Sequence, residues 1–380
     1  MNGNNNRKSM YVAIILIAMI LLTLVTVYAS ATVGETLRVS ARSAVLYQPD
    51  TDNFIYTKNA DERMPMASTT KIMTALVVID AVDDITETVT VGEDAAGTEG
   101  SSAYLKAGEK LTVEELLYAL LLQSANDAAV ALACHVGGDV EGFADMMNER
   151  ALEMGLSDTH FSNPHGLDDD EHYTTARDLA RIGAAALENE LLRSIASTYK
   201  RTFKSEERVR TYVNHNKLLL RYDGAIGVKT GYTKRCGRCL VGAAERDGLT
   251  LVSVTLDAPS DWSDHSAMLD YGYERLERIA LADVYKYKYD LPVLESNIAQ
   301  IRVTNVEELG TVLPRGEHDV REYVKLPRFL TAPVREGEIV GSVSFTVDGE
   351  YVGCVDIVAT EDVKPIKKDN LLKKIFGLFK

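Results

Sequence analysis

Several features are scarce in this chain, and each scarcity excludes a class of protein. With 9 prolines and 26 glycines among 380 residues, and with 46% apolar and 26% charged side chains, the composition excludes wholesale disorder, collagen-like repetition and a polytopic membrane protein. Tandem repeats of 20–50 residues and low-complexity linkers are absent, which excludes solenoids and propellers. The remaining possibility is a globular chain of two domains or one large domain.

Positive charge is also scarce, except at the two ends. The formal net charge is −15, but residues 1–31 carry +2 and residues 364–380 carry +5, so the body between them carries −22. A body this acidic repels phosphate backbones, and nucleic acid is therefore excluded as a partner. The basic residues at the two ends indicate that each terminal segment has a role distinct from that of the acidic body.

The N-terminal end has the three parts of an export signal. Arg7 and Lys8 precede the apolar run from Met10 to Tyr28, and Ala29-Ser30-Ala31 follows as an A-x-A cleavage site. We interpret residues 1–31 as a signal peptide, with an uncleaved N-terminal anchor as the alternative, because the apolar run is long enough to cross a bilayer. Both interpretations place the rest of the chain outside the cytoplasm.

Cysteine is nearly absent too, and the four that occur do not define a disulfide framework. Cys134, Cys236, Cys239 and Cys354 allow three full pairings in an exported chain. Cys236 and Cys239 have redox-motif spacing, but no βαβ pattern surrounds them. Local thiols or a structural bridge are favoured over a thioredoxin-like dithiol.

The pattern of apolar residues changes near residue 283. Residues 32–280 mix helical and strand patterns, whereas residues 281–363 show short alternating strands that predict a small β-sandwich. Asp348-Gly349 between two alternating runs predicts a two-residue hairpin turn. Residues 364–380 predict an amphipathic helix with lysines opposite an apolar face, which favours an anionic membrane surface; docking on the protein's own core is the alternative.

The first chemical motif is Ser68-Thr69-Thr70-Lys71, followed by an apolar run that predicts a buried helix from about Ser68. A spacing of three places both side chains on one face of the first turn, so the Lys71 amine can approach the Ser68 hydroxyl. A desolvated lysine near another cation becomes neutral more easily and can then accept the serine proton. A serine and a lysine three residues apart are also common on solvated helix faces, so this motif alone does not indicate catalysis.

Two further motifs follow along the chain. Thr112 and Glu115 predict a capping box for a helix that ends before Ser124-Ala125-Asn126, and Asp127 is the expected cap of the next helix. This tight loop either projects Ser124 and Asn126 into a cleft or merely satisfies helix ends.

Lys229-Thr230-Gly231 precedes a predicted strand. It offers a cation and a hydroxyl to a carboxylate, and a glycine that leaves room for a substrate backbone.

In this order, the three motifs resemble the active site of penicillin-binding serine peptidases, and the chain is similar to the low-molecular-weight serine D-alanyl-D-alanine carboxypeptidases. The resemblance extends to residues 63–75, Asn163-Pro164-His165-Gly166-Leu167 and residues 172–180. It implies an α+β fold, with a helical subdomain and a helix-flanked antiparallel sheet, followed by a small all-β domain. It also implies peptidoglycan stem peptides as substrates, β-lactams as covalent inhibitors, and no metal or cofactor.

The resemblance further implies the roles of the reacting residues. Ser68 would attack the carbonyl of the penultimate D-alanine and form an acyl-enzyme, with Lys71 as its base. Ser124 would relay a proton to the leaving amine. The backbone N–H groups of Ser68 and Tyr232 would form the oxyanion hole.

The remaining implied roles concern substrate binding. Asn126 would hold the amide on the acyl side of the substrate. Lys229 and Thr230 would bind the terminal carboxylate beside Gly231, and Lys229 would also lower the pKa of Lys71.

Two features depart from the family. Relatives often have a basic residue after the strand that follows K-T-G, whereas residues 257–264 here contain none, and Cys236 replaces a small residue. Carboxylate binding would then depend on Lys229 and Thr230.

Three alternatives stay open at this point. A class A β-lactamase would need an E-x-x-x-N arrangement between Asn126 and Lys229, and none has suitable surroundings. A metallopeptidase would need H-E-x-x-H, and the best substitute is the acidic patch around His165 and His172. An inactive wall-binding module would not need the complete set of motifs.

Overall fold

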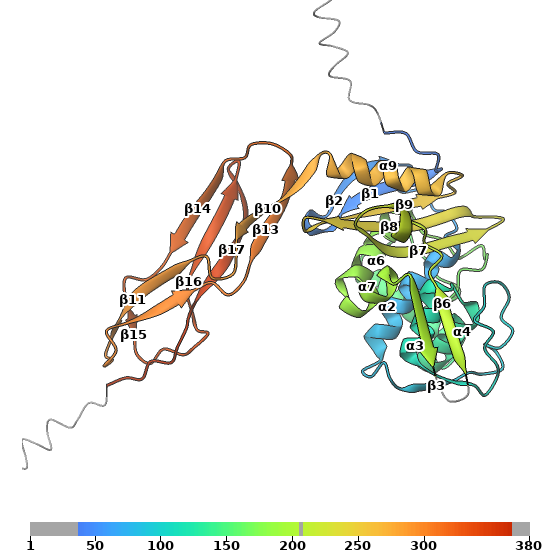
Figure 1. The fold of residues 1–380 in the computed structure, drawn as a ribbon, viewed down its shortest axis with the longest axis horizontal. Helices are drawn as coiled ribbons and strands as arrows, with labels where there is room; N and C mark the ends of the chain where they lie inside the picture. Colours follow the sequence, from blue (N-terminus) through green and yellow to red (C-terminus); the bar gives the residue numbers. More distant parts are fainter. Residues whose placement is uncertain (1–36, 205–207, 367–380) are drawn as a thin grey trace, which may run out of the picture.

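The computed structural model describes residues 37–204 and 208–366 (Figure 1). The expected signal peptide and the predicted helix from Lys367 onward lie outside these residues. Within them, no helix combines the length and the apolar character needed to cross a membrane.

A five-stranded antiparallel sheet forms the centre of the first domain, with strand order β2-β1-β9-β8-β7. Its strands are β1 (Ser43–Gln48), β2 (Asn53–Lys58), β7 (Ala225–Thr233), β8 (Gly237–Arg246) and β9 (Leu249–Leu256). Strand β1 pairs both with β2 and with β9, the last strand of this sheet in chain order, which brings distant parts of the sequence together. Strand β7 is at the edge, so one side of it is open to a ligand.

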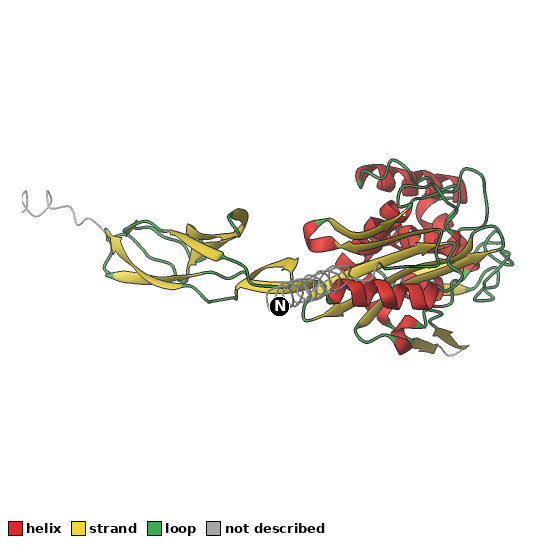
Figure 2. Cartoon of the chain, turned by 90° about the horizontal axis from the view of Figure 1, so that it is seen from above, coloured by secondary structure: helices red, strands yellow, loops and turns green. Residues whose placement is uncertain are grey.

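Helices cover both faces of this sheet (Figures 1 and 2). Helix α9 (Asp261–Tyr273) packs on β8 and β9 over one apolar cluster, whereas α6 (Ala176–Glu188) and α7 (Glu190–Ser197) lie on the other side. The Thr175 hydroxyl caps α6 by accepting from Asp178 N. The expected helix-flanked antiparallel sheet is confirmed.

The helical subdomain surrounds α2 (Lys71–Ala81), whose first eight residues are all buried. Around it lie α3 (Val113–Leu122), α4 (Asn126–Gly137) and α5 (Val140–Glu153). A 3₁₀ turn, η2 (Ala67–Thr70), carries Ser68, so the predicted helix begins three residues later as an α-helix. The smaller elements are η1 (Pro49–Thr51), β3 (Thr88–Thr90), β4 (Lys110–Thr112), β5 (Lys200–Lys204), β6 (Val209–Val213) and α8 (Leu218–Arg221).

Two cap predictions need correction. Thr112 does cap α3 by accepting from Glu115 N, but the Glu115 carboxylate binds Arg208 and Tyr212, so the box is not reciprocal. Asp127 lies inside α4 rather than before it. Its carboxylate accepts from the backbone N–H groups of Ala103 and Leu105, because a buried carboxylate needs several donors.

The C-terminal domain is all β, as expected. Its strands are β10 (Leu276–Ala282), β11 (Lys288–Leu294), β12 (Gln300–Thr304), β13 (Leu309–Pro314), β14 (Val320–Lys325), β15 (Leu330–Thr331), β16 (Ile339–Val347) and β17 (Glu350–Ala359). Strands β11, β12, β16 and β17 share one apolar core. The predicted hairpin is confirmed, because Asp348 and Gly349 join β16 to β17 with φ of 53° and 90°, as a type I′ turn requires.

The expected boundary after residue 280 falls within β10, which pairs with β13. The exact domain limits therefore stay a prediction.

Candidate active site

Ser68 lies in the η2 turn, half-buried, at the wall of a cavity of about 370 Å³. The preceding residue, Ala67, has φ of 48°, a left-handed conformation that side chains other than glycine rarely adopt. Such strain occurs mainly where surrounding packing imposes it, often at functional sites. The turn presents the Ser68 hydroxyl to the Lys71 amine, and the distance from Lys71 Nζ to Ser68 Oγ is 3.0 Å.

The Lys71 amine is fully buried and has three hydrogen-bond partners. It lies 2.7 Å from Asn126 Oδ1 and 2.6 Å from the carbonyl oxygen of His165, in addition to Ser68. Asn126 Oδ1 and the His165 carbonyl oxygen can only accept hydrogen bonds, so a neutral Lys71 amine donates its two hydrogens to them. Its lone pair then faces the Ser68 hydroxyl, which is the arrangement of a base and its nucleophile.

The electrostatics of the site favour this neutral form. Burial lowers the pKa of Lys71 well below the ordinary lysine value, and the positive charge of Lys229 lowers it further. Asp127 acts in the opposite direction. Lys229 is itself buried, and desolvation lowers its pKa to about 7.

The interhelical loop brings Ser124 to the same cavity. Ser124 joins α3 to α4 with φ of 61°, and its buried side chain lines the cavity. Asn126 lies deeper and is not among the lining residues. Its amide nitrogen donates to the carbonyl oxygen of Glu99 at 2.5 Å while its oxygen accepts from Lys71. The structure thus links Asn126 to the lysine.

Strand β7 forms the opposite wall through Thr230, Gly231 and Tyr232. A Cβ on Gly231 would lie 3.0 Å from Ser68 N, so a larger residue would push the strand and the serine turn slightly apart. Tyr232 is 66% exposed. Lys229 is not among the residues that line the cavity, and its amine donates to the carbonyl oxygen of Thr230 at 2.8 Å.

The loop from Asn163 to Leu167 supports Lys71, a role that the sequence did not indicate. Its His165 carbonyl accepts from Lys71, and its Pro164 carbonyl accepts from Thr74 Oγ1 at 2.6 Å. Gly166 has φ of 87°, and a Cβ there would lie 1.9 Å from the carbonyl oxygen of Ala67. The glycine after Asn163-Pro164-His165 was the available signal for a tight turn.

The two neighbouring cysteines are buried free thiols in the described chain. Cys236 lies 3.3 Å from Asp168 Oδ1, and burial raises its pKa to about 11 and that of Cys239 to about 12. A thiolate is therefore disfavoured at both positions, which argues against a thioredoxin-like dithiol.

His172, which belongs to the acidic patch considered for a metal, uses both ring nitrogens in hydrogen bonds to other residues. Nε2 of His172 lies 2.7 Å from Thr70 Oγ1, and Nδ1 accepts from Ser162 N at 3.0 Å. Burial lowers the pKa of His172 to about 4. Over residues 37–204 and 208–366, no three His, Cys, Asp or Glu side chains group as a metal site. This histidine supports the serine turn.

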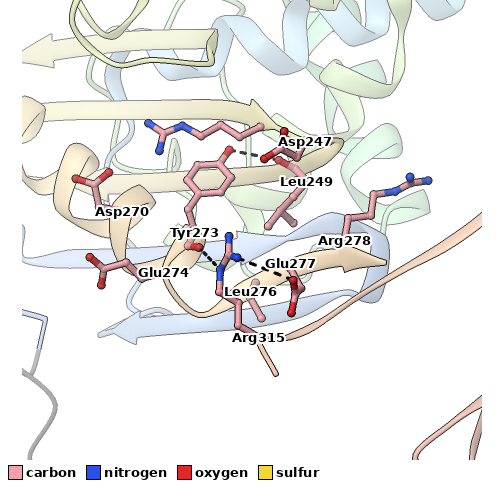
Figure 3. Close-up of a pocket in the computed structure, with 10 residues that line it drawn as sticks. Asp247, Leu249, Asp270, Tyr273, Glu274, Leu276, Glu277, Arg278 and Arg315 are labelled. Atoms are coloured by element: carbon pink, nitrogen blue, oxygen red, sulfur yellow. Dashed lines mark hydrogen bonds and ion pairs between the residues drawn. The ribbon is translucent and has the colours of Figure 1, made fainter. Parts of the chain in front are cut away.

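A larger cavity of about 570 Å³ lies elsewhere, at the end of α9 and the start of the C-terminal domain (Figure 3). Its lining is mainly acids and arginines, and Arg315 donates to the Tyr273 carbonyl oxygen at 2.9 Å. Serine and lysine are both absent from this lining. The nucleophile and its base belong to the smaller cavity.

Comparisons with known proteins found relatives that cover both domains. Residues 29–260 match the family described as D-alanyl-D-alanine carboxypeptidase, and residues 283–365 match the C-terminal domain of penicillin-binding protein 5. The D-alanyl-D-alanine carboxypeptidase DacF of Bacillus subtilis (strain 168) is 32% identical over 89% of both chains. Penicillin-binding protein 5 of Haemophilus influenzae has a similar structure, with a TM-score of 0.65 and 28% identity over 87% of this chain and 99% of that one. The Streptomyces K15 DD-transpeptidase gives a TM-score of 0.59 and 35% identity over 62% of this chain and 98% of that one.

Proposed function

The chain belongs to the D-alanyl-D-alanine carboxypeptidase family, and from this premise we propose that it is a penicillin-sensitive serine carboxypeptidase that removes the terminal D-alanine from peptidoglycan stem pentapeptides. The observation that carries the proposal is the Lys71 amine, which lies 3.0 Å from Ser68 Oγ and has two further acceptors for its hydrogens, Asn126 Oδ1 and the His165 carbonyl oxygen. This geometry supports nucleophilic attack by serine without a histidine.

In the acylation step, Lys71 takes the proton of Ser68 as Oγ attacks the carbonyl carbon of the penultimate D-alanine. The negative charge that develops on the carbonyl oxygen is stabilised by the backbone N–H groups of Ser68 and Tyr232. One such donor contributes on the order of 3–4 kcal/mol to the transition state. The contact between Gly231 and the serine turn supports this assignment, because it keeps strand and turn adjacent.

When the tetrahedral intermediate collapses, the C–N bond breaks and the leaving amine of D-alanine takes a proton. We assign this transfer to Ser124, which lines the cavity with Ser68. Asn126 positions Lys71, and this task takes precedence over binding the acyl-side amide. Water then hydrolyses the ester on Ser68, and a β-lactam would acylate the same atom.

The proposal also includes the location of the enzyme. Export by residues 1–31 would bring the active site to the substrate, and the basic segment 364–380 would hold the enzyme on an anionic membrane surface. The C-terminal domain would then separate the cleft from the membrane.

The test compares two serines of one cavity. Ser68→Ala is expected to lose both D-alanine release from a diacyl-Lys-D-Ala-D-Ala peptide and covalent labelling by benzylpenicillin, with an unchanged circular dichroism spectrum. Ser101→Ala serves as the matched control, since Ser101 lines the cavity but its side chain makes no hydrogen bond to a lysine within the described residues. Labelling of the Ser68 variant at the wild-type rate would exclude Ser68 as nucleophile.

A further inference from the structure

A substrate that ends in a carboxylate needs a cation at the cleft, and Lys229 is poorly placed to supply it. Its amine is buried, bound to the Thr230 carbonyl oxygen, and absent from the cavity lining. Desolvation also lowers its pKa to about 7, which weakens its positive charge relative to an ordinary lysine. Another residue has to hold the carboxylate.

Strand pairing shows which residue shares a face with the Thr230 hydroxyl. Thr230 pairs with Leu240, and Tyr232 pairs with Arg238. Directly paired residues, and residues two apart on one strand, project to the same side of a sheet, so Thr230 and Arg238 are diagonal neighbours. Leu240 belongs to the apolar cluster under α9, so the side chains of Thr230 and Arg238 lie on the face of the sheet that α9 covers. Lys229 pairs with Val241 and lies on the opposite face.

The guanidinium of Arg238 is anchored and still accessible. Its Nη1 lies 3.3 Å from Asp261 Oδ1, and Asp261 is buried at the start of α9. The Arg238 side chain is 53% exposed and lines the cavity together with Ser68 and Thr230. Within the described chain its Nε and Nη2 make no hydrogen bond, which leaves two donors for an anion.

The other charged groups of the cavity leave a net positive charge. Lys217 and Arg238 are cations and Asp261 is an anion. His215 is neutral, because burial and Lys229 lower its pKa. The cavity thus carries about one positive charge, which suits one carboxylate. A planar guanidinium also matches the two oxygens of a carboxylate better than an ammonium does.

We propose that Arg238, held by Asp261 and assisted by the Thr230 hydroxyl, binds the terminal carboxylate of the substrate and thereby selects peptides with a free C-terminus. This inference rests on the proposed carboxypeptidase function. Residues 257–264 contain no basic side chain, and Arg238 on β8 would supply the carboxylate-binding cation in their place. Lys229 then acts on Lys71 alone.

The experiment compares two substrates that differ only in charge. One is a D-alanyl thioester whose leaving group ends in a free carboxylate, and the other is its methyl ester; a thioester is reactive enough for turnover of both to be measured. Arg238→Gln is expected to lower kcat/KM about 10- to 100-fold for the carboxylate and less than about threefold for the ester. Arg238→Lys should recover part of the loss, since lysine keeps the positive charge but lacks the two parallel N–H donors of a guanidinium.

Two matched variants complete the design. Arg221→Gln replaces an exposed arginine of α8 outside the cavity lining, and Lys217→Gln removes the other cation of the cavity. Melting temperatures show whether each variant is folded. Equal losses on both substrates, no loss, or selective loss only in the Lys217 variant would overturn the proposal while the carboxypeptidase function stands. If the wild type neither turns over a thioester nor forms a penicillin adduct, both proposals fail.

Discussion

Replacing Gly166 by alanine tests how the loop beneath the serine turn sustains catalysis. Gly166 has φ of 87°, and the new Cβ would lie 1.9 Å from the carbonyl oxygen of Ala67 and 2.8 Å from Thr70 Oγ1. The first contact is with backbone, so the loop and the turn that carries Ser68 have to move apart. That movement pulls the Pro164 and His165 carbonyls away from their donors.

The expected magnitude has two parts. Alanine in a left-handed conformation costs about 1–2 kcal/mol. Losing the bonds from Thr74 to Pro164 and from Lys71 to His165 adds about 2–4 kcal/mol, since each loss leaves a buried polar group without its partner. The free energy of unfolding should therefore fall by about 3–6 kcal/mol. The acylation rate should fall at least about tenfold, because a misplaced base loses more than 1.36 kcal/mol of transition-state stabilisation.

Gly138→Ala is the matched control. Gly138 has φ of 84°, close to the φ of Gly166, but a Cβ there would meet nothing within 4 Å. This variant should lose only about 1–2 kcal/mol and acylate at the wild-type rate. Urea unfolding and stopped-flow acylation by a fluorescent penicillin measure both quantities. Equal effects of the two substitutions would refute the close-approach argument.

Four further predictions follow from the site and the termini. Lys229→Gln removes a positive charge that lowers the pKa of Lys71, so this pKa should rise in the variant. The acidic limb of the pH profile of acylation should then move to higher pH, and a limb that stays in place would contradict the coupling between the two lysines. Ser124→Ala should slow acylation about 100-fold or more at an unchanged melting temperature, and a wild-type rate would exclude the proton relay. Because burial raises the pKa of Cys236 to about 11, iodoacetamide should label it slowly in the native protein at pH 7.5, and labelling as fast as in urea would show an accessible thiolate. Deleting residues 367–380 should release the signal-cleaved protein from anionic vesicles without lowering its peptidase activity, and persistent binding would exclude the tail as anchor.

Local patterns in the sequence were sufficient for the features that depend on neighbouring residues. The Asp348-Gly349 turn follows from the need for two positive φ angles, and the Thr112 cap follows from its position before an apolar helix. The spacing of Ser68 and Lys71 was sufficient to place the two side chains together. The order of the three motifs along the chain then indicated the family resemblance.

Contacts between distant residues were beyond these patterns. The His165 carbonyl that orients Lys71 comes from a loop 94 residues away, and a backbone oxygen leaves no trace in residue type. Asp127 resembled a helix cap, yet its carboxylate binds backbone N–H groups more than 20 residues earlier. Arg238 could be related to Thr230 only through the register of two strands. Tertiary packing decided each of these cases.

The most direct test of the central claim is mass spectrometry of the purified protein after incubation with benzylpenicillin and, separately, with a diacyl-Lys-D-Ala-D-Ala peptide. The account predicts a long-lived penicilloyl adduct on the peptide that contains Ser68, and release of one D-alanine from each substrate molecule. Rapid hydrolysis of penicillin without D-alanine release, or no reaction with either compound, would contradict it.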